Sequence, residues 1–300
     1  FSGAVEAWLV DALHFCGYDK DLESVFAKGQ TIGGVAMLTG SVAGGVVAQF
    51  TNLGVPYLLR AVLLGLTFVT AFLMMKDLGF SPVRGTGPIK EVKKVLKASI
   101  DNGWRKRPIR WLMLAAPFTG GVGIYAFYAM QPYLLELYGD ESAFAIAGLA
   151  AAIVAGAQIV GGLLVTRVRR LFERRTHILI LTSVISVVVL AAIGLTSNFW
   201  VAIVLLVLWS LTFAMSMPVR QAYLNGIIPS EQRATVLSFD ALMSSAGGVG
   251  IQPALGRAAD VWSYSVSYVI SSVVALAAVP FVVLARAEDA ESDLIREQVP

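Results

Sequence analysis

Long apolar stretches separated by short polar ones make up most of this 300-residue chain. Most stretches are about 20 residues long, and a helix of that length, rising 1.5 Å per residue, crosses the roughly 30 Å hydrocarbon core of a bilayer. The pattern predicts nine membrane-spanning helices, at residues 1–17, 31–51, 55–76, 109–131, 143–166, 176–197, 199–226, 235–257 and 263–286. The chain is therefore expected to be an all-α polytopic membrane protein.

One long polar run, residues 76–110, interrupts the apolar pattern, and it holds ten of the 23 Lys and Arg residues. Loops rich in these residues beside membrane spans stay in the cytoplasm. If this run is inside, alternation of the nine helices places 20 of the 23 basic residues inside, and these 20 include the ten of the run. The sequence therefore predicts a cytoplasmic linker and a cytoplasmic C-terminus.

Within the linker, apolar residues recur at helical spacing between lysines, from Ile89 to Ile100. This is the pattern of a basic amphipathic helix on the inner leaflet, in contact with membrane lipids, or of a solvated tether between two helix bundles. The predicted division has four parts. They are the last helices of an N-terminal bundle (1–76), the linker (77–108), a C-terminal six-helix bundle (109–286) and an acidic cytoplasmic tail (287–300).

The composition agrees with a membrane protein, since 57% of residues are hydrophobic, 14% are charged and the mean hydropathy is +0.73. The basic residues lie beside predicted spans, so the pI of about 9.0 does not imply a nucleic-acid partner. One cysteine excludes an internal disulfide, and with two histidines it provides no metal site of the usual ligand count. No phosphate-binding loop of the ATPase kind occurs, and no cofactor is expected.

An internal repeat relates the two sides of the linker. Residues 43–49 (AGGVVAQ) and 246–252 (AGGVGIQ) are identical at five of seven positions. The same relation aligns residues 4–11 with 218–225, which pairs Glu6 with Arg220. The chain begins without Met and inside an apolar stretch, with three helices before the linker and six after it. We therefore expect two parallel halves, of which the first lacks three helices.

Three short segments resemble motifs of the major facilitator superfamily. Residues 1–11 (FSGAVEAWLVD) are similar to the fourth helix of many bacterial members, and residues 40–45 (GSVAGG) to the glycine-rich antiporter motif of the fifth, with serine in place of its proline. Residues 162–170 (GLLVTRVRR) resemble the second copy of the family's loop motif, with threonine in place of its acid and arginine in place of a glycine. The resemblance implies the major facilitator fold, with two pseudo-symmetric helical bundles and an incomplete N-terminal bundle.

Charged side chains in membrane helices are costly and are candidates for function. We expect Glu6 and Arg220 to face one another across a central cavity. They form a cytoplasmic-side gate or the charged part of the binding site, with Glu6 as the protonation site, or else a static pair that locks the bundles together. The other gating or structural candidates are Asp11, Asn225, Asp240, Arg233 and Arg167. The predicted helix-packing glycines are Gly40, Gly44, Gly45, Gly247 and Gly248. In the cavity wall we expect Tyr125, Tyr128 and Gln131, which suit a lipophilic or weakly polar substrate.

The sequence thus favours a monomeric secondary transporter of a bacterial inner membrane, exporting a small lipophilic molecule in exchange for protons, rather than an enzyme. Uptake of a nutrient is an alternative within the same class. A magnesium-dependent prenyl transferase using Asp19, Asp21 and Glu23 is a second alternative, although the second aspartate-rich loop that such chemistry needs is missing from the sequence. A non-transporting membrane sensor is a third.

Overall fold

The structure is a computed structural model that describes residues 12, 15–17, 22–76, 97, 101, 104–140, 142–168, 171–228 and 233–295. Within these ranges the chain is helical and contains no strand. The helices are α2 (Leu22–Phe50), α3 (Gly54–Met74), α5 (Arg107–Tyr138), α6 (Phe144–Val168), α7 (Arg175–Leu195), α8 (Phe199–Ile227), α9 (Arg233–Val261), α10 (Tyr264–Leu276), α11 (Val279–Ala287) and the short 3-10 helix η4 (Glu291–Asp293).

The predicted all-α fold is confirmed, and eight of the nine predicted segments coincide with these helices. The first segment, 1–17, lies almost wholly outside the described residues, as does most of the linker. Six helical stretches are long and apolar enough to cross a membrane: 32–50, 54–74, 107–138, 175–195, 199–224 and 264–287. The α6 and α9 helices do not reach this threshold over their described residues.

Three of the predicted helix assignments were wrong. Residues 132–138, expected beyond the end of a helix, belong to α5. Residues 22–30, expected in a loop, form the first turns of α2, because helical propensity continues through this less apolar stretch. The last predicted helix is two helices, α10 and α11, separated at Ala277 and Ala278. Pro280 lies in the first turn of α11, where its missing N–H leaves no helical bond unmade, and its ring disfavours a continuous helix through the preceding turn.

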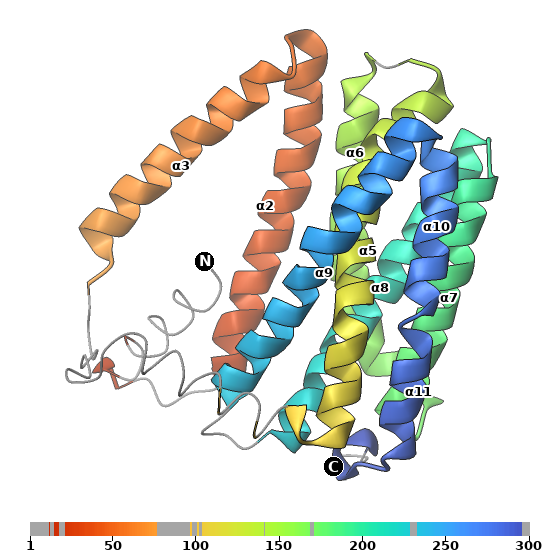
Figure 1. Cartoon of the computed structure of the whole chain (residues 1–300). Helices are drawn as coiled ribbons and strands as arrows, with labels where there is room; N and C mark the ends of the chain where they lie inside the picture. The colour runs from red at the N-terminus through yellow and green to blue at the C-terminus, as the bar shows by residue number, and fades with distance from the viewer. Residues whose placement is uncertain are drawn as a thin grey trace.

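Helices α5 to α11 form one bundle, and α2 stands beside it (Figure 1). The closest pairs are α5 with α9, α2 with α6, α10 with α7, and α6 and α7 with α8. Helix α3 diverges from the bundle, lies close to α2 only near the turn that joins them, and buries none of its residues (Figure 1). We call the end at which α5, α7 and α9 begin and α8 and α11 end the linker end.

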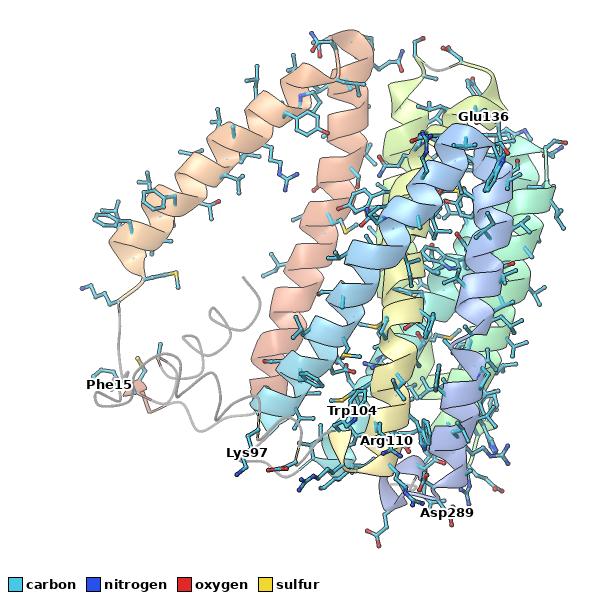
Figure 2. The ribbon with its side chains drawn as sticks, in the orientation of Figure 1. Phe15, Lys97, Trp104, Arg110, Glu136 and Asp289 are labelled. Atoms are coloured by element: carbon cyan, nitrogen blue, oxygen red, sulfur yellow. The ribbon has the colours of Figure 1, made fainter. Side chains whose placement is uncertain are left out.

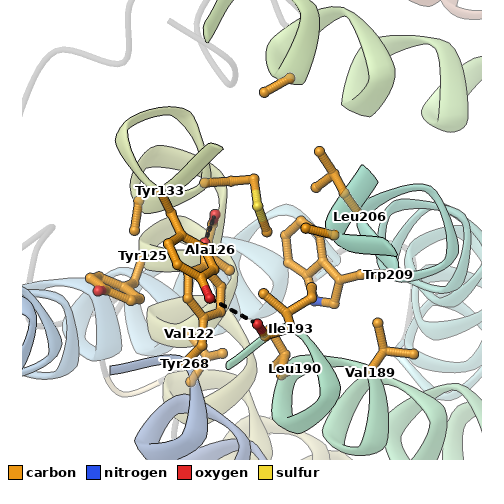
Figure 3. Close-up of a cluster of buried hydrophobic side chains, with 14 of the residues drawn as sticks. Val122, Tyr125, Ala126, Tyr133, Val189, Leu190, Ile193, Leu206, Trp209 and Tyr268 are labelled. Carbon is orange, nitrogen blue, oxygen red and sulfur yellow. Dashed lines mark hydrogen bonds between the residues drawn. The ribbon is translucent and has the colours of Figure 1, made fainter. Parts of the chain in front are cut away.

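The core of the bundle consists of two apolar clusters, one toward each end. In the cluster far from the linker end, tyrosine hydroxyls bond to backbone carbonyls of neighbouring helices (Figure 3). Tyr133 on α5 donates to the carbonyl of Ile193 on α7 at 3.2 Å, and Tyr268 on α10 donates to that of Ala126 at 2.8 Å. Because buried polar groups need partners, these bonds fix α5, α7 and α10 relative to one another.

Helix α2 meets the bundle at a close crossing with α6. A Cβ atom added to Gly148 would lie 2.7 Å from the carbonyl oxygen of Ser41 and 3.0 Å from the Cα of Gly45. Contacts this short leave no room for a side chain, so the glycine allows the two backbones to approach. The crossing joins the segment before the linker to the bundle after it.

We expect Gly148→Val to separate α2 from α6, whereas Gly156→Val on the same helix should not, because an added Cβ at Gly156 meets nothing within 4 Å. A pair of spin labels, one on α2 and one on α6, measures the separation by double electron–electron resonance. Equal distances in the two variants would contradict the close crossing.

Candidate functional site

Inside the described part of the bundle, Arg220 on α8 and Asp240 on α9 form an ion pair that is largely buried. The two guanidinium nitrogens each donate to one carboxylate oxygen at 2.5 Å, so the contact is bidentate. The side chain of Asp240 is 9% exposed and that of Arg220 is 21% exposed. The same guanidinium also donates to the carbonyl of Leu112 on α5 at 3.3 Å. One cation therefore joins three helices.

The pair lies within the span of the helices rather than at their ends. Arg220 comes seven residues before the end of α8 at Ile227, and Asp240 seven residues after the start of α9 at Arg233. At 1.5 Å per residue each is about 10 Å inside the linker end. Charges at such depth are rare in membrane helices and mark sites of function or of tight structural pairing.

The structure gives Arg220 a partner that the sequence analysis did not assign to it. Glu6, the partner expected from the repeat, and Asp11 lie outside the described residues. So do the side chains of the other charged and amide candidates, Asn225, Arg233 and Arg167, although their backbones are helical. Asp240 was predicted as a separate gating or capping residue, and here it is the counter-ion of Arg220.

The three predicted cavity residues on α5 do not share one environment. Tyr125 is 4% exposed, and its hydroxyl bonds that of Ser267 on α10 at 2.5 Å, so it faces the interior of the bundle. Tyr128 is 60% exposed, and Gln131 is partly buried nearly one turn further on. Tyr128 and Gln131 remain candidates for substrate contact, and Tyr125 is held in helix packing.

The predicted packing glycines also divide. Gly247 on α9 lies so close to α5 that an added Cβ would be 1.9 Å from the carbonyl oxygen of Pro117, and Gly248 is 3.1 Å from a methyl of Ile124 by the same measure. Gly45 meets Gly148 on α6. Added Cβ atoms at Gly40 and Gly44 meet nothing within 4 Å in the described part of the chain.

Sequence reasoning missed three features of the structure. The carbonyl of Leu112, Gly148 and the residues after α11 have no motif that distinguishes them in the sequence. Glycine spacing gave a partial signal for Gly148, which precedes Gly156 by eight residues in an Ala- and Gly-rich helix. Over the described ranges, no group of three or more His, Cys, Asp or Glu side chains is placed to hold a metal ion.

Residues 169–299 match the family model of the Major Facilitator Superfamily. These residues, fewer than half of the chain, are similar to this superfamily. The match begins at the end of α6 and includes α7 to α11, and thus both members of the Arg220–Asp240 pair.

One solved structure supports the observed fold over most of the chain. A bacterial homologue of the human lysosomal transporter Spinster, in an inward-facing and occupied conformation, is 18% identical with a TM-score of 0.52, and the alignment covers 89% of this chain and 68% of that one. The same homologue in an inward-facing and unoccupied conformation gives 20% identity and a TM-score of 0.45, over 86% and 65% of the two chains. A comparison with curated proteins found no match. The family match and the fold together support a secondary transporter that crosses the membrane several times.

Proposed function

We propose that this major facilitator protein exports a small lipophilic molecule from a bacterial cell in exchange for protons. The linker end then faces the cytoplasm, as the ten basic residues of the run 76–110 favour. The observation that carries the proposal is the bidentate Arg220–Asp240 pair, a charge site held inside an apolar helical bundle.

In the proposed cycle Arg220 exchanges between two carboxylates. One state of the cycle has Arg220 on Asp240, as in the structure. In that state of the proposed cycle Glu6 lacks the cation and holds a proton. When the bundles approach at the linker end, Arg220 contacts Glu6 and Glu6 releases its proton, while Asp240, left without its cation, takes up a proton. Such an exchange couples a proton to alternating access without any covalent step.

The surface available to a substrate favours an apolar one. Ile124 and Tyr128, which lie on one face of α5, are 37% and 60% exposed, and Gln131 follows on the same side. An aromatic ring, an aliphatic side chain and one amide suit a molecule that is mostly hydrophobic with few polar groups. A nutrient sugar or amino acid would need several more hydrogen-bonding partners than this face provides.

Transport in liposomes under an imposed pH gradient tests the proposal, with tetraphenylphosphonium as the first lipophilic probe. We expect proton-driven movement by the wild type and at least a tenfold loss in Glu6→Gln, since the amide does not release a proton. The control is Glu136→Gln, because Glu136 is exposed at the end of α5 far from the linker end (Figure 2). Unchanged coupling in Glu6→Gln would remove Glu6 from the mechanism. Movement of a sugar or amino acid instead of the probe would favour the alternative, a nutrient permease.

A further inference from the structure

The residues after α11 fold back onto the linker end of the bundle, where Asp289 lies on the same end as Arg110 (Figure 2). We call residues 288–295 the tail strap. Its central side chain, Asp293, is 1% exposed although it is a carboxylate. One oxygen accepts the backbone N–H of Thr176 at 2.8 Å, and the other accepts the Thr176 hydroxyl at 2.7 Å.

These two bonds cap helix α7 from a distance in sequence. The N-cap residue of α7, Arg174, makes no side-chain capping bond of its own. Helix N-termini expose unpaired N–H groups and favour a negative charge, and the Asp293 carboxylate provides both an acceptor and that charge. Arg174 contacts Asp289 and Asp293, and the hydrogen bond to Asp289 raises the pKa of the Arg174 guanidinium above its ordinary value.

Backbone contacts extend the attachment to α7. Leu294 forms an antiparallel bridge with Arg174, and the N–H of Ile295 donates to the carbonyl of Glu173 at 2.9 Å. The Arg175 guanidinium donates to the carbonyls of Ser292 and Leu294. The strap is therefore an ordered segment fixed to α7.

The strap also holds the last two turns of α8. The Ser292 hydroxyl donates to the carbonyl of Tyr223 at 3.0 Å, and a Cβ added to Gly226 would lie 2.5 Å from the Cβ of Ser292. The Tyr223 hydroxyl donates to the carbonyl of Ala285 on α11 at 3.2 Å. From another side Lys106, just before α5, donates to the carbonyl of Ile227 at 3.1 Å.

Arg220 lies three residues before Tyr223, on nearly the same face of α8. A displacement of Tyr223 along the helix axis therefore displaces Arg220 by the same amount. Arg220 and Asp240 form a short bidentate contact, and a contact with this geometry tolerates little displacement of either side chain.

We infer that the tail strap is a positioning element, which fixes the linker end of α8 so that Arg220 is in register with Asp240. The role assigned to Arg220 in transport rests on the proposed function, but the positioning itself does not. Detaching the strap loosens the last turns of α8 and lengthens the ion pair, while the helices of the bundle remain packed.

A thermal double-mutant cycle tests the inference on the purified full chain. Asp293→Ala removes both bonds to Thr176 and should lower the Tm by roughly 2–6 °C. In an Asp240→Asn background the ion pair is already lost, so the position of Arg220 no longer affects stability through that pair. In this background Asp293→Ala should lower the Tm by less than half as much as it does in the wild type. The matched control is Glu291→Ala, an exposed acid in the same strap, which should leave the Tm unchanged in both backgrounds.

Additive Tm shifts in the cycle would overturn the inference, because they would mean that the strap only stabilises its own contacts. Hydrogen exchange gives a second measurement that does not need Asp240→Asn to fold. Ser292→Ala should increase the exchange of the backbone amides of residues 223–227 at least threefold, whereas Ser197→Ala, at an exposed site between α7 and α8, should not. Unchanged exchange would likewise exclude positioning by the strap. Neither experiment depends on transport, so failure of the proposed function leaves both interpretable.

Discussion

Replacing Asp240 by asparagine is expected to lower the free energy of unfolding by about 3–5 kcal/mol, because it leaves the Arg220 charge buried without a carboxylate. For a chain of this size that corresponds to a fall in Tm of roughly 10 °C. Differential scanning fluorimetry in detergent measures it. The effect is large because the pair is bidentate and also holds the Leu112 carbonyl of a third helix.

Asp260 provides the matched control, since it lies on the same helix α9 but is exposed near the far end. Asp260→Asn should leave the Tm within about a degree of the wild type. The double replacement of Arg220 by methionine and Asp240 by leucine should recover most of the stability, since no buried charge remains. If Asp240→Asn proved as mild as Asp260→Asn, the pair would not be a buried one.

The second large effect is expected for Gly247→Ala. The added Cβ would lie 1.9 Å from the carbonyl oxygen of Pro117 and 2.5 Å from its Cα, and neither backbone atom yields as a side chain does. Overpacking of this kind costs about 1–3 kcal/mol or more. We expect a fall in Tm of roughly 5–10 °C, with less folded protein recovered.

Gly250→Ala separates this crowding from the general effect of alanine in a helix. Gly250 lies one turn away on α9, and an added Cβ there meets nothing within 4 Å. Alanine is the better helix former, so Gly250→Ala should hold or slightly raise the Tm. Equal Tm values for the two variants would contradict the close crossing of α5 and α9.

Sequence reasoning located the helices because a bilayer span needs a long apolar stretch, and that requirement is visible residue by residue. Sequence reasoning failed where a helix boundary or a bond depends on contacts between residues far apart in the sequence. The early start of α2 and the division between α10 and α11 have no change of hydropathy that marks them. The sequence predicts only an acidic tail where the structure has the strap. The bonds of Asp293 to Thr176 join residues 117 positions apart, and no local pattern indicates them.

For the candidate site, the sequence identified Arg220 and Asp240 separately, since each is a charge in an apolar helix. Their pairing depends on the rotation of α8 relative to α9, which neither helix encodes alone. The internal repeat predicted Glu6 as the partner of Arg220 instead. Tyr125 is a second example, because successive residues of a helix point about 100° apart. Whether a tyrosine on α5 faces a cavity or a neighbouring helix depends on that direction, and the Tyr125 hydroxyl bonds Ser267 on α10.

The close packing of α5 and α9 has a consequence for the order in which the chain enters the membrane. Helix α9 contains Asp240, Arg257 and Asp260 and is not among the stretches apolar enough to span by themselves. It therefore partitions poorly as an isolated segment. Its partner α5 is apolar enough and is synthesised about a hundred residues earlier. Insertion of α9 thus follows that of α5 and α8, because α5 provides close glycine contacts and α8 provides a counter-charge. A ribosome-bound chain that ends before α9 already contains the helices against which α9 inserts.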